Sequence, residues 1–170
     1  CLADCTPQMR AAYDAACAQM QRLFGVAEEM GAIDLPTLRE DAFLLTEAEA
    51  VCSLGNAPGL SRGLEKLIAY GRTLTPERMA QVHVRLDAAR ATLRASVGKT
   101  RVLLTPTVAT PAFAHGARPP VGQADFTALA NIAAVPALAI PMAGTPYPRS
   151  VQIVGPPGSE AVLLALAARL

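Results

Sequence analysis

The 170-residue chain carries 15 Lys and Arg against 14 Asp and Glu, a formal net charge of +1, and 52% of its residues are hydrophobic. This balance removes the usual electrostatic argument for a nucleic-acid partner or an anionic membrane surface. Pro, Asn or Gly breaks the apolar stretches well short of the roughly 18 to 20 residues that a membrane span needs. We therefore interpret the apolar excess as burial, and we expect neither nucleic acid nor membrane as a partner.

The N-terminus begins CLADC, without an initiator Met and without the basic flank and apolar run of a secretory signal. These features favour an internal piece or a processed product of a longer protein. The four cysteines form no CxxC pair and have only two histidines beside them, so we expect no metal site and no cofactor. Reduced thiols in a cytoplasmic protein are the expected state.

Composition divides the chain near residue 100. Residues 1–100 hold 12 of the 14 acidic residues but only 4 of the 14 prolines. The first part is therefore predicted to be mainly helical and solvated. The remainder, residues 101–170, is predicted to be buried and irregular.

Four helices are predicted in the first part from apolar spacing and end signals. They span 6–25, 34–53, 61–71 and 75–98. Thr6, Ser61 and Thr75 are the expected N-caps of the first, third and fourth helices. The expected apolar face of the second helix consists of Leu38, Ala42, Leu45, Ala48 and Cys52. The fourth, with about 22 residues, would be about 33 Å long, enough to brace one face of a wide sheet. VAEEM, residues 26–30, could be a short strand.

In the second part, strands are predicted at 101–107, 136–142 and 150–155, and helices from caps at Asp125 and Ser159. An irregular loop, VATPAFAHGARPPVGQ, follows the first strand. The last two strands are uncharged on both faces, as expected where helices cover both sides of a sheet. Their prolines argue against a simple alternating hairpin. This order of helices and strands predicts a layered α/β architecture.

Three stretches, VLLTPTVATPAF, DFTALANIAAVPALAIPMAG and SVQIVGPPGSEAVLLALAARL, together resemble the C-terminal part of the amidase signature family. Enzymes of this family are serine hydrolases of amides, including the amidotransferase subunit that makes ammonia for tRNA-bound glutamine. The resemblance implies that residues 1–170 are the C-terminal portion of a single amidase domain. In it, residues 1–100 would be a covering helical segment, and residues 101–170 would supply core strands, cleft loop and final helix of an α/β/α fold with a mixed sheet.

The family departs from this sequence before the last strand. The family usually has a longer connection there, which ends in Gly-Leu-Pro-x-Gly. The corresponding TPYPRS of this chain is shorter and lacks both glycines. The turn between the last two strands is therefore not predicted.

The catalytic groups of the family find no counterpart in this sequence. Its enzymes work through a lysine, a serine held by a cis peptide and a nucleophilic serine in a Gly-rich loop. The chain has only Lys66 and Lys99, both in charged helical contexts, and its five serines lie in no Gly-rich loop. We therefore expect no catalytic residue here, a Ser-Ser-Lys site elsewhere in the protein, and no activity from the isolated chain.

Candidate substrate-binding residues follow from the same resemblance. Thr105, Thr107 and Val108 fall where the loop after the LLTPT strand lines the cleft in enzymes of this family. An equally favoured interpretation is a Thr-Pro strand end that satisfies its own backbone groups. Asn131 could order the floor of the cleft, but local backbone bonds are the favoured interpretation. For Gln152, a structural hydrogen bond to neighbouring loops is favoured over contact with substrate.

Two hypotheses for function remain. The leading one is that the chain gives scaffold and pocket wall to an amide hydrolase, with a small-molecule amide substrate and the remainder of the amidase domain as partners; a homodimer is left open. The alternative is a non-catalytic binding or assembly module derived from the same fold. A reading frame that continues upstream of Cys1 into a lysine and a Gly-Ser-rich loop would favour the enzyme.

Overall fold

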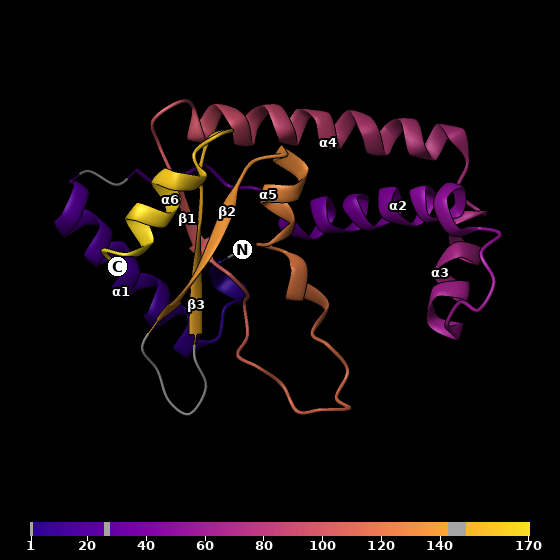
Figure 1. The fold of residues 1–170 in the computed structure, drawn as a ribbon, viewed down its shortest axis with the longest axis horizontal. Coiled ribbons are helices and arrows are strands. Elements are labelled where there is room, and N and C mark those ends of the chain that lie inside the picture. Colours follow the sequence, from indigo (N-terminus) through magenta and orange to yellow (C-terminus); the bar gives the residue numbers. More distant parts are fainter. Residues whose placement is uncertain (1, 26–27, 143–148) are drawn as a thin grey trace.

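The computed structural model describes residues 2–25, 28–142 and 149–170. A three-stranded sheet lies at one end of the molecule and a group of helices extends from it (Figure 1). The helices are α1 (Pro7–Phe24), α2 (Leu35–Leu54), α3 (Arg62–Gly71), α4 (Pro76–Val97), α5 (Ala128–Ala133) and α6 (Glu160–Ala167), with short 3-10 turns η1 (Leu2–Asp4) and η2 (Val121–Ala124). The strands are β1 (Leu103–Pro106), β2 (Ala137–Met142) and β3 (Arg149–Val154).

The three predicted N-caps of the first part are confirmed. The side chains of Thr6, Ser61 and Thr75 each accept a hydrogen bond from the backbone N–H three residues later. Each hydroxyl satisfies one of the N–H groups that the first turn of a helix leaves without an intrahelical partner. Gly25 ends α1 with φ at 91°, a conformation that glycine adopts without steric cost.

The sheet has the strand order β1-β3-β2, and both pairings are antiparallel. The predicted argument against a hairpin is therefore wrong, because β2 and β3 are consecutive and pair along their length. Pro141 is tolerated since β2 is an edge strand of this sheet. The turn between β2 and β3 falls at 143–148, outside the described residues, and so do residues 26 and 27 of the predicted VAEEM strand. Residues 28–30 form no strand.

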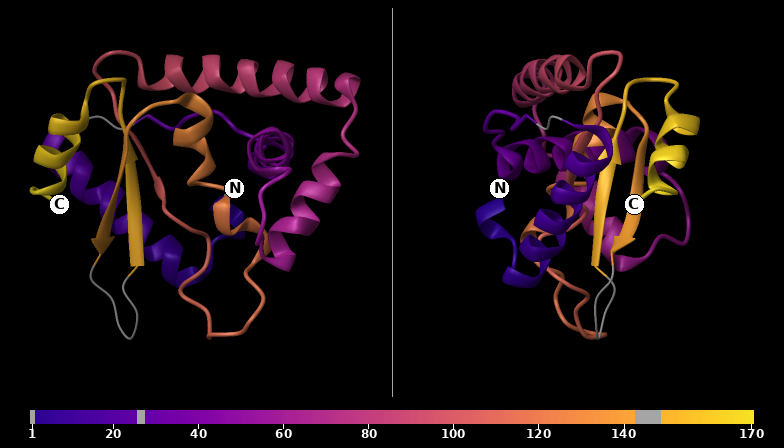
Figure 2. Two further views of the ribbon diagram at one scale, coloured as in Figure 1. Left: turned by 45° about the vertical axis from the view of Figure 1, so that its right-hand side comes forward. Right: turned by 90° about the vertical axis from the view of Figure 1, so that its left-hand side faces the viewer.

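Both faces of β3 are covered, as its uncharged sequence predicts. Val151 and Ile153 point to a cluster that includes Ala16 of α1 and Leu163 of α6. Figure 2 shows α1 and α6 on one side of the sheet and α2 to α5 on the other. On that second side, Phe126 belongs to the larger cluster, which α2, α4 and α5 build. The α/β class is confirmed, and the sheet of this part of the fold joins two helical layers.

The position of α4 differs from the expectation. Its 22 residues pack against α2 and α5 and do not brace the sheet. The buried stripe of α4 consists of Val82, Leu86, Leu93 and Val97. The first three share a cluster with apolar side chains of these two helices, among them Leu44, Leu129 and Ile132. The stripe is satisfied by helix-on-helix packing because α2 and α5 lie between α4 and the rest of the fold (Figure 1).

The predicted apolar face of α2 is confirmed in part. Leu38, Ala42 and Leu45 are half-buried and pack against the larger cluster, whereas Cys52 is exposed. The most buried residues of α2 are Leu35, Arg39, Asp41 and Leu44. Two of the buried side chains are charged, and each has an ion-pair partner: Arg85 of α4 donates two hydrogen bonds of 2.6 Å to Asp41, and Arg39 pairs with Asp125. Periodicity in apolar residues alone could not reveal a face that buries ion pairs.

The junction of α2 and α3 requires a glycine. A β-carbon at Gly71 would lie 2.5 Å from the carbonyl oxygen of Glu47, closer than real contacts allow. The two helices therefore pack with backbone against backbone, and they form an arm that extends away from the sheet (Figure 1).

Membrane and metal features can be checked over the described ranges. None of the helices there combines the length and apolar character that a bilayer crossing demands. No group of three or more His, Cys, Asp or Glu side chains gathers there as a metal cage would. Cys5, Cys17 and Cys52 are free thiols.

Candidate functional site

The side-chain amide of Gln152 is the polar centre of the sheet. This residue is 4% exposed, and its Nε2 donates hydrogen bonds to Thr105 Oγ1 at 3.0 Å and to the backbone oxygen of Phe126 at 2.7 Å. Register places Gln152 opposite Thr105 on the neighbouring strand. The predicted structural hydrogen bond is confirmed, and it reaches both a strand and the segment that leads into α5.

Thr105 and Thr107 use their polar groups differently. Thr105 is buried, and its hydroxyl donates to the carbonyl of Pro106 at 2.9 Å while it accepts from Gln152. The backbone N–H of Thr107 donates to Ser150 at 3.1 Å. Its Oγ1 is buried and has no hydrogen-bond partner among the described residues. Thr105 is therefore engaged in holding the sheet, whereas the Thr107 hydroxyl still has capacity for a partner.

Val108 follows β1 at the start of a long loop. This loop extends beyond the end of the sheet (Figure 2). Its side chain is half-buried, and the carbonyl of the next residue, Ala109, accepts a hydrogen bond from the N–H of Thr6 at 2.9 Å. This bond ties the start of the loop to the cap of α1. Val108 is thus held by its neighbours on a segment that is otherwise exposed from Ala112 to Pro119.

A hollow of about 180 Å³ lies between α2 and the segment that joins η2 to α5. Its lining comprises Arg39, Ala42, Phe43 and Thr46 from α2, and Ala124, Thr127, Ala128 and Asn131 from the facing segment. We name this group of eight residues the α2–α5 hollow. Of the candidate site residues, only Asn131 belongs to it. Thr105, Thr107 and Val108 lie outside it, at the end of β1.

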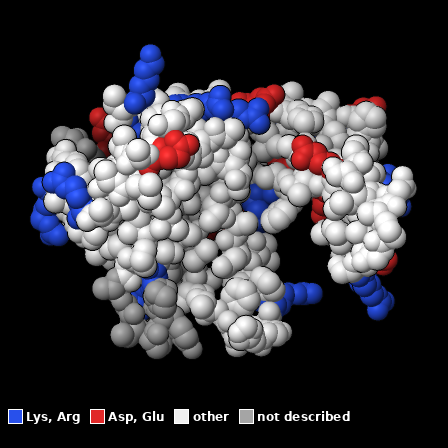
Figure 3. Space-filling view, in the orientation of Figure 1, with Lys and Arg blue, Asp and Glu red and all other residues white. Residues whose placement is uncertain are grey.

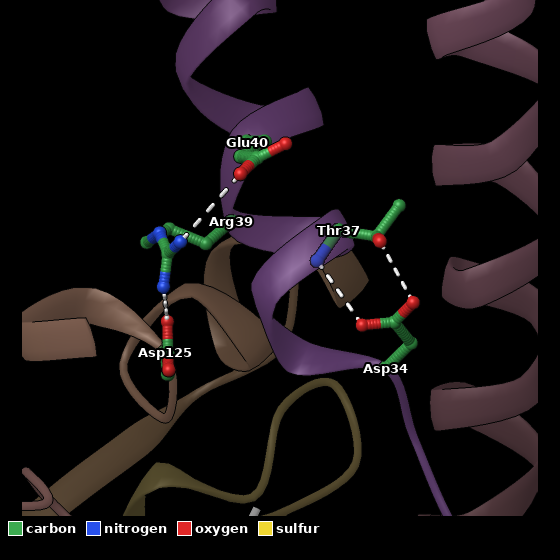
Figure 4. Close-up of polar contacts among 5 residues, drawn as sticks. All are labelled: Asp34, Thr37, Arg39, Glu40 and Asp125. Atoms are coloured by element: carbon green, nitrogen blue, oxygen red, sulfur yellow. Dashed lines mark hydrogen bonds and ion pairs between the residues drawn. The ribbon is translucent and has the colours of Figure 1, made fainter. Parts of the chain in front are cut away.

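Arg39, which lines the α2–α5 hollow, forms a buried ion pair with Asp125. Arg39 and Asp125 are each 7% exposed, and a guanidinium N–H of Arg39 donates to the Asp125 carboxylate (Figure 4). The predicted cap at Asp125 is therefore wrong: α5 begins three residues later, at Ala128, and the carboxylate is taken up by Arg39. A second carboxylate, that of Glu40, lies 3.9 Å from Arg39 on its exposed side.

The side chain of Asp34 caps the start of α2. The Asp34 carboxylate accepts hydrogen bonds from the backbone N–H of Thr37 at 3.2 Å and from its hydroxyl at 2.7 Å (Figure 4). These bonds favour the ionised form and hold the pKa of Asp34 below its usual range. The cap is therefore present at neutral pH and is lost as the pH falls through this lowered pKa.

Groups that could carry covalent chemistry are scattered over the described residues. Ser61 caps α3, and the hydroxyl of Ser96 donates to its own helix at 2.9 Å. Ser159 precedes α6 as predicted, but its buried hydroxyl makes no capping bond. No hydrogen bond in this part of the chain joins a serine to Lys66 or Lys99.

Comparisons with known proteins give a family and a shared fold. The sequence model of the family described as Amidase matches residues 59–164. A search of the curated proteins found no match. Among solved structures, the chain is similar to an amidase, with 21% identity, a TM-score of 0.79, and coverage of 98% of this chain and 42% of that one.

Two further solved structures share the fold. One is a bacterial aryl acylamidase of the amidase signature enzymes, with 14% identity, a TM-score of 0.78, and coverage of 97% of this chain and 40% of that one. The other is 6-aminohexanoate cyclic dimer hydrolase in complex with substrate, with 20% identity, a TM-score of 0.69, and coverage of 97% and 41%. The chain therefore spans about two fifths of the length of the structures that it matches.

The hydrogen bonds of the Gln152 side chain should contribute measurably to the free energy of unfolding. Gln152→Met keeps the length of the side chain but leaves the carbonyl of Phe126 without its donor, so the free energy of unfolding should fall by about 1 to 3 kcal/mol. Urea denaturation of the two proteins measures it. The matched control is Gln81→Met, an exposed position on α4, which should change stability by less than about 0.5 kcal/mol. Equal losses in both variants would contradict the assigned role of Gln152.

Proposed function

Because the chain belongs to the amidase family, we propose that it is the C-terminal portion of a serine hydrolase that cleaves carboxamide C–N bonds. In this proposal the chain supplies scaffold and one wall of the substrate pocket. The family match over residues 59–164 carries the proposal, and the shared fold over nearly the whole chain supports it. The substrate class is a small-molecule amide.

The chemistry of amide hydrolysis indicates which groups the remainder of the domain would have to supply. A serine hydroxyl attacks an amide only when a base removes its proton and backbone N–H groups hold the oxyanion. In this chain Ser61 and Ser96 are committed to helices, and both lysines are exposed. The Ser-Ser-Lys groups would therefore come from the remainder of the amidase domain, which is the chain's first partner in this proposal.

The surface of the molecule offers a place for that partner. Figure 3 shows a wide notch between the arm of α2 and α3 and the loop that follows β1, on a face with large uncharged areas. The Thr107 hydroxyl, which has no hydrogen-bond partner among the described residues, lies at the start of this loop. In addition, β1 and β2 are both edge strands of the three-stranded sheet. Edge strands offer unpaired N–H and C=O groups that further strands can complete.

The first test is direct. The purified 170-residue chain should hydrolyse no simple carboxamide, whereas the full-length enzyme should, because positioning without nucleophile and base gives little rate. Ammonia release measures both, and a full-length variant whose nucleophilic serine is changed to alanine sets the background. Turnover by the 170-residue chain above that background would place the chemistry inside it. A full-length protein that hydrolyses no amide would favour the non-catalytic binding or assembly module.

The second test concerns the pocket wall. In the full-length enzyme, Val108→Phe should lower kcat/KM for bulky amides by about tenfold or more and leave small amides nearly unaffected, because the larger side chain occupies cleft volume. The control is the same substitution at Val84, which is 70% exposed on α4 and should have no effect. A series of amides of increasing size measures the preference. Equal losses across the series would place Val108 outside the pocket.

A further inference from the structure

The C-terminal end of α5 is held from outside by two arginines of α4. The Nε of Arg90 donates a hydrogen bond to the carbonyl of Ile132 at 3.0 Å. Arg94 donates from Nε to the carbonyl of Ala133 at 2.7 Å and from Nη2 to that of Ala134 at 3.4 Å. We propose that both arginines are positioning residues for the substrate pocket, because they fix the direction of α5. The link to substrate rests on the proposed function, whereas the anchoring of α5 rests on these contacts.

The backbone of α5 satisfies only part of its own end. The N–H of Ala134 donates to the carbonyl of Asn131 at 3.1 Å, and the N–H of Val135 donates to that of Ala130 at 3.1 Å. These two bonds form a Schellman motif, in which a left-handed residue ends the helix. The next three carbonyls, at 132–134, are the ones that the arginines take up. Each carbonyl from 130 to 134 therefore has a donor.

The residue that ends α5 is strained. Ala134 has φ at 50° and ψ at 57°, the left-handed conformation in which glycine usually ends a helix. Among the described residues, no other residue except glycine has a positive φ. The β-carbon of an alanine makes this conformation unfavourable. The two guanidinium groups oppose that strain, because they donate charge-assisted hydrogen bonds at the negative end of the helix.

The shortness of α5 makes its anchors decisive. A helix of six residues cannot keep a direction by itself. The Gln152 amide fixes the segment before α5 through the carbonyl of Phe126, and the arginines fix the end of α5. Asn131, the candidate for the floor of the cleft, lies between the two anchors. Loss of the second anchor should therefore displace Asn131 without unfolding the protein.

Kinetics of the full-length enzyme test this role. Arg94→Ala should raise KM for the best substrate of the amide series by about fivefold or more, the effect of about one lost hydrogen bond to substrate. Because α5 carries no group of the chemistry, kcat should change by less than about twofold. The Tm should fall by about 1 to 4 °C. Ammonia release and thermal unfolding measure these changes.

A second substitution separates positioning from stability. Ala134→Gly relieves the left-handed strain, and the position is exposed, so loss of the methyl group leaves no cavity. It should raise the Tm of the wild type and of Arg94→Ala by about the same amount, about 1 to 4 °C. In the double variant the Tm should recover while KM stays raised, because glycine adds no donor and loosens the turn. An arginine that only stabilised the fold would give recovery of both.

Arg72 offers a matched control in the arm. This arginine also takes up a carbonyl after a helix, since its guanidinium donates to Gly55, which follows α2, at 2.6 Å. Arg72→Ala should lower the Tm as Arg94→Ala does and leave KM unchanged. The comparison isolates the place of the capped helix from the chemistry of the cap.

Hydrogen exchange tests the anchor apart from turnover. In Arg94→Ala, the amides of Ala134 and Val135 should exchange at least about fivefold faster than in the wild type. Unchanged exchange overturns the inference whatever the activity. Recovery of KM in Arg94→Ala/Ala134→Gly, or an equal rise of KM in Arg72→Ala, also overturns it and leaves the proposed function standing. A wild-type full-length protein that hydrolyses no amide overturns the proposed function and, with it, the role toward substrate.

Discussion

The buried side-chain amide of Gln152 is the constraint on which the arrangement of β1, α5 and α2 around the candidate site depends. An amide removed from water must find partners inside the protein, and this one finds them in β1 and in the segment before α5. Its contact with Phe126 fixes that segment on the sheet. The preceding residue, Asp125, is then placed where Arg39 of α2 can reach it, so the sheet, α5 and the arm are held in one chain of polar contacts.

The opposite face of β3 works by a different principle. There Val151 and Ile153 meet α1 and α6 through apolar contacts that are not directional. Strand alternation separates the two faces, so one strand is anchored by packing on one side and oriented by hydrogen bonds on the other. This arrangement leaves the hollow and the loop after β1 on the hydrogen-bonded side, where geometry is more closely specified.

Local features of the fold could be predicted from the sequence. The caps at Thr6, Ser61 and Thr75 depend on contacts three residues apart, and strands bounded by proline and glycine were placed to within two residues. The order of helices and strands predicted the α/β class, and the resemblance added the family. The hairpin of β2 and β3 was missed because a proline in an edge strand removes no bond that this sheet needs.

Long-range ion pairs account for the other errors. The partners of Arg39 and Asp41 lie 86 and 44 residues away, so nothing near either residue indicates that it is buried. For the same reason the α2–α5 hollow was not predicted. Of its lining residues, only Asn131 was a candidate, whereas Arg39 and Phe43 resemble the exposed side chains of any helix.

We propose, as the central point, that this chain shapes an amide hydrolase site whose nucleophile lies elsewhere in the protein. A fluorophosphonate probe, which reacts with activated serine hydroxyls, tests it on the full-length enzyme followed by peptide mapping. We predict a single labelled serine outside residues 1–170, with Ser53, Ser61, Ser96, Ser150 and Ser159 unmodified. Labelling of any of these five serines would contradict the account.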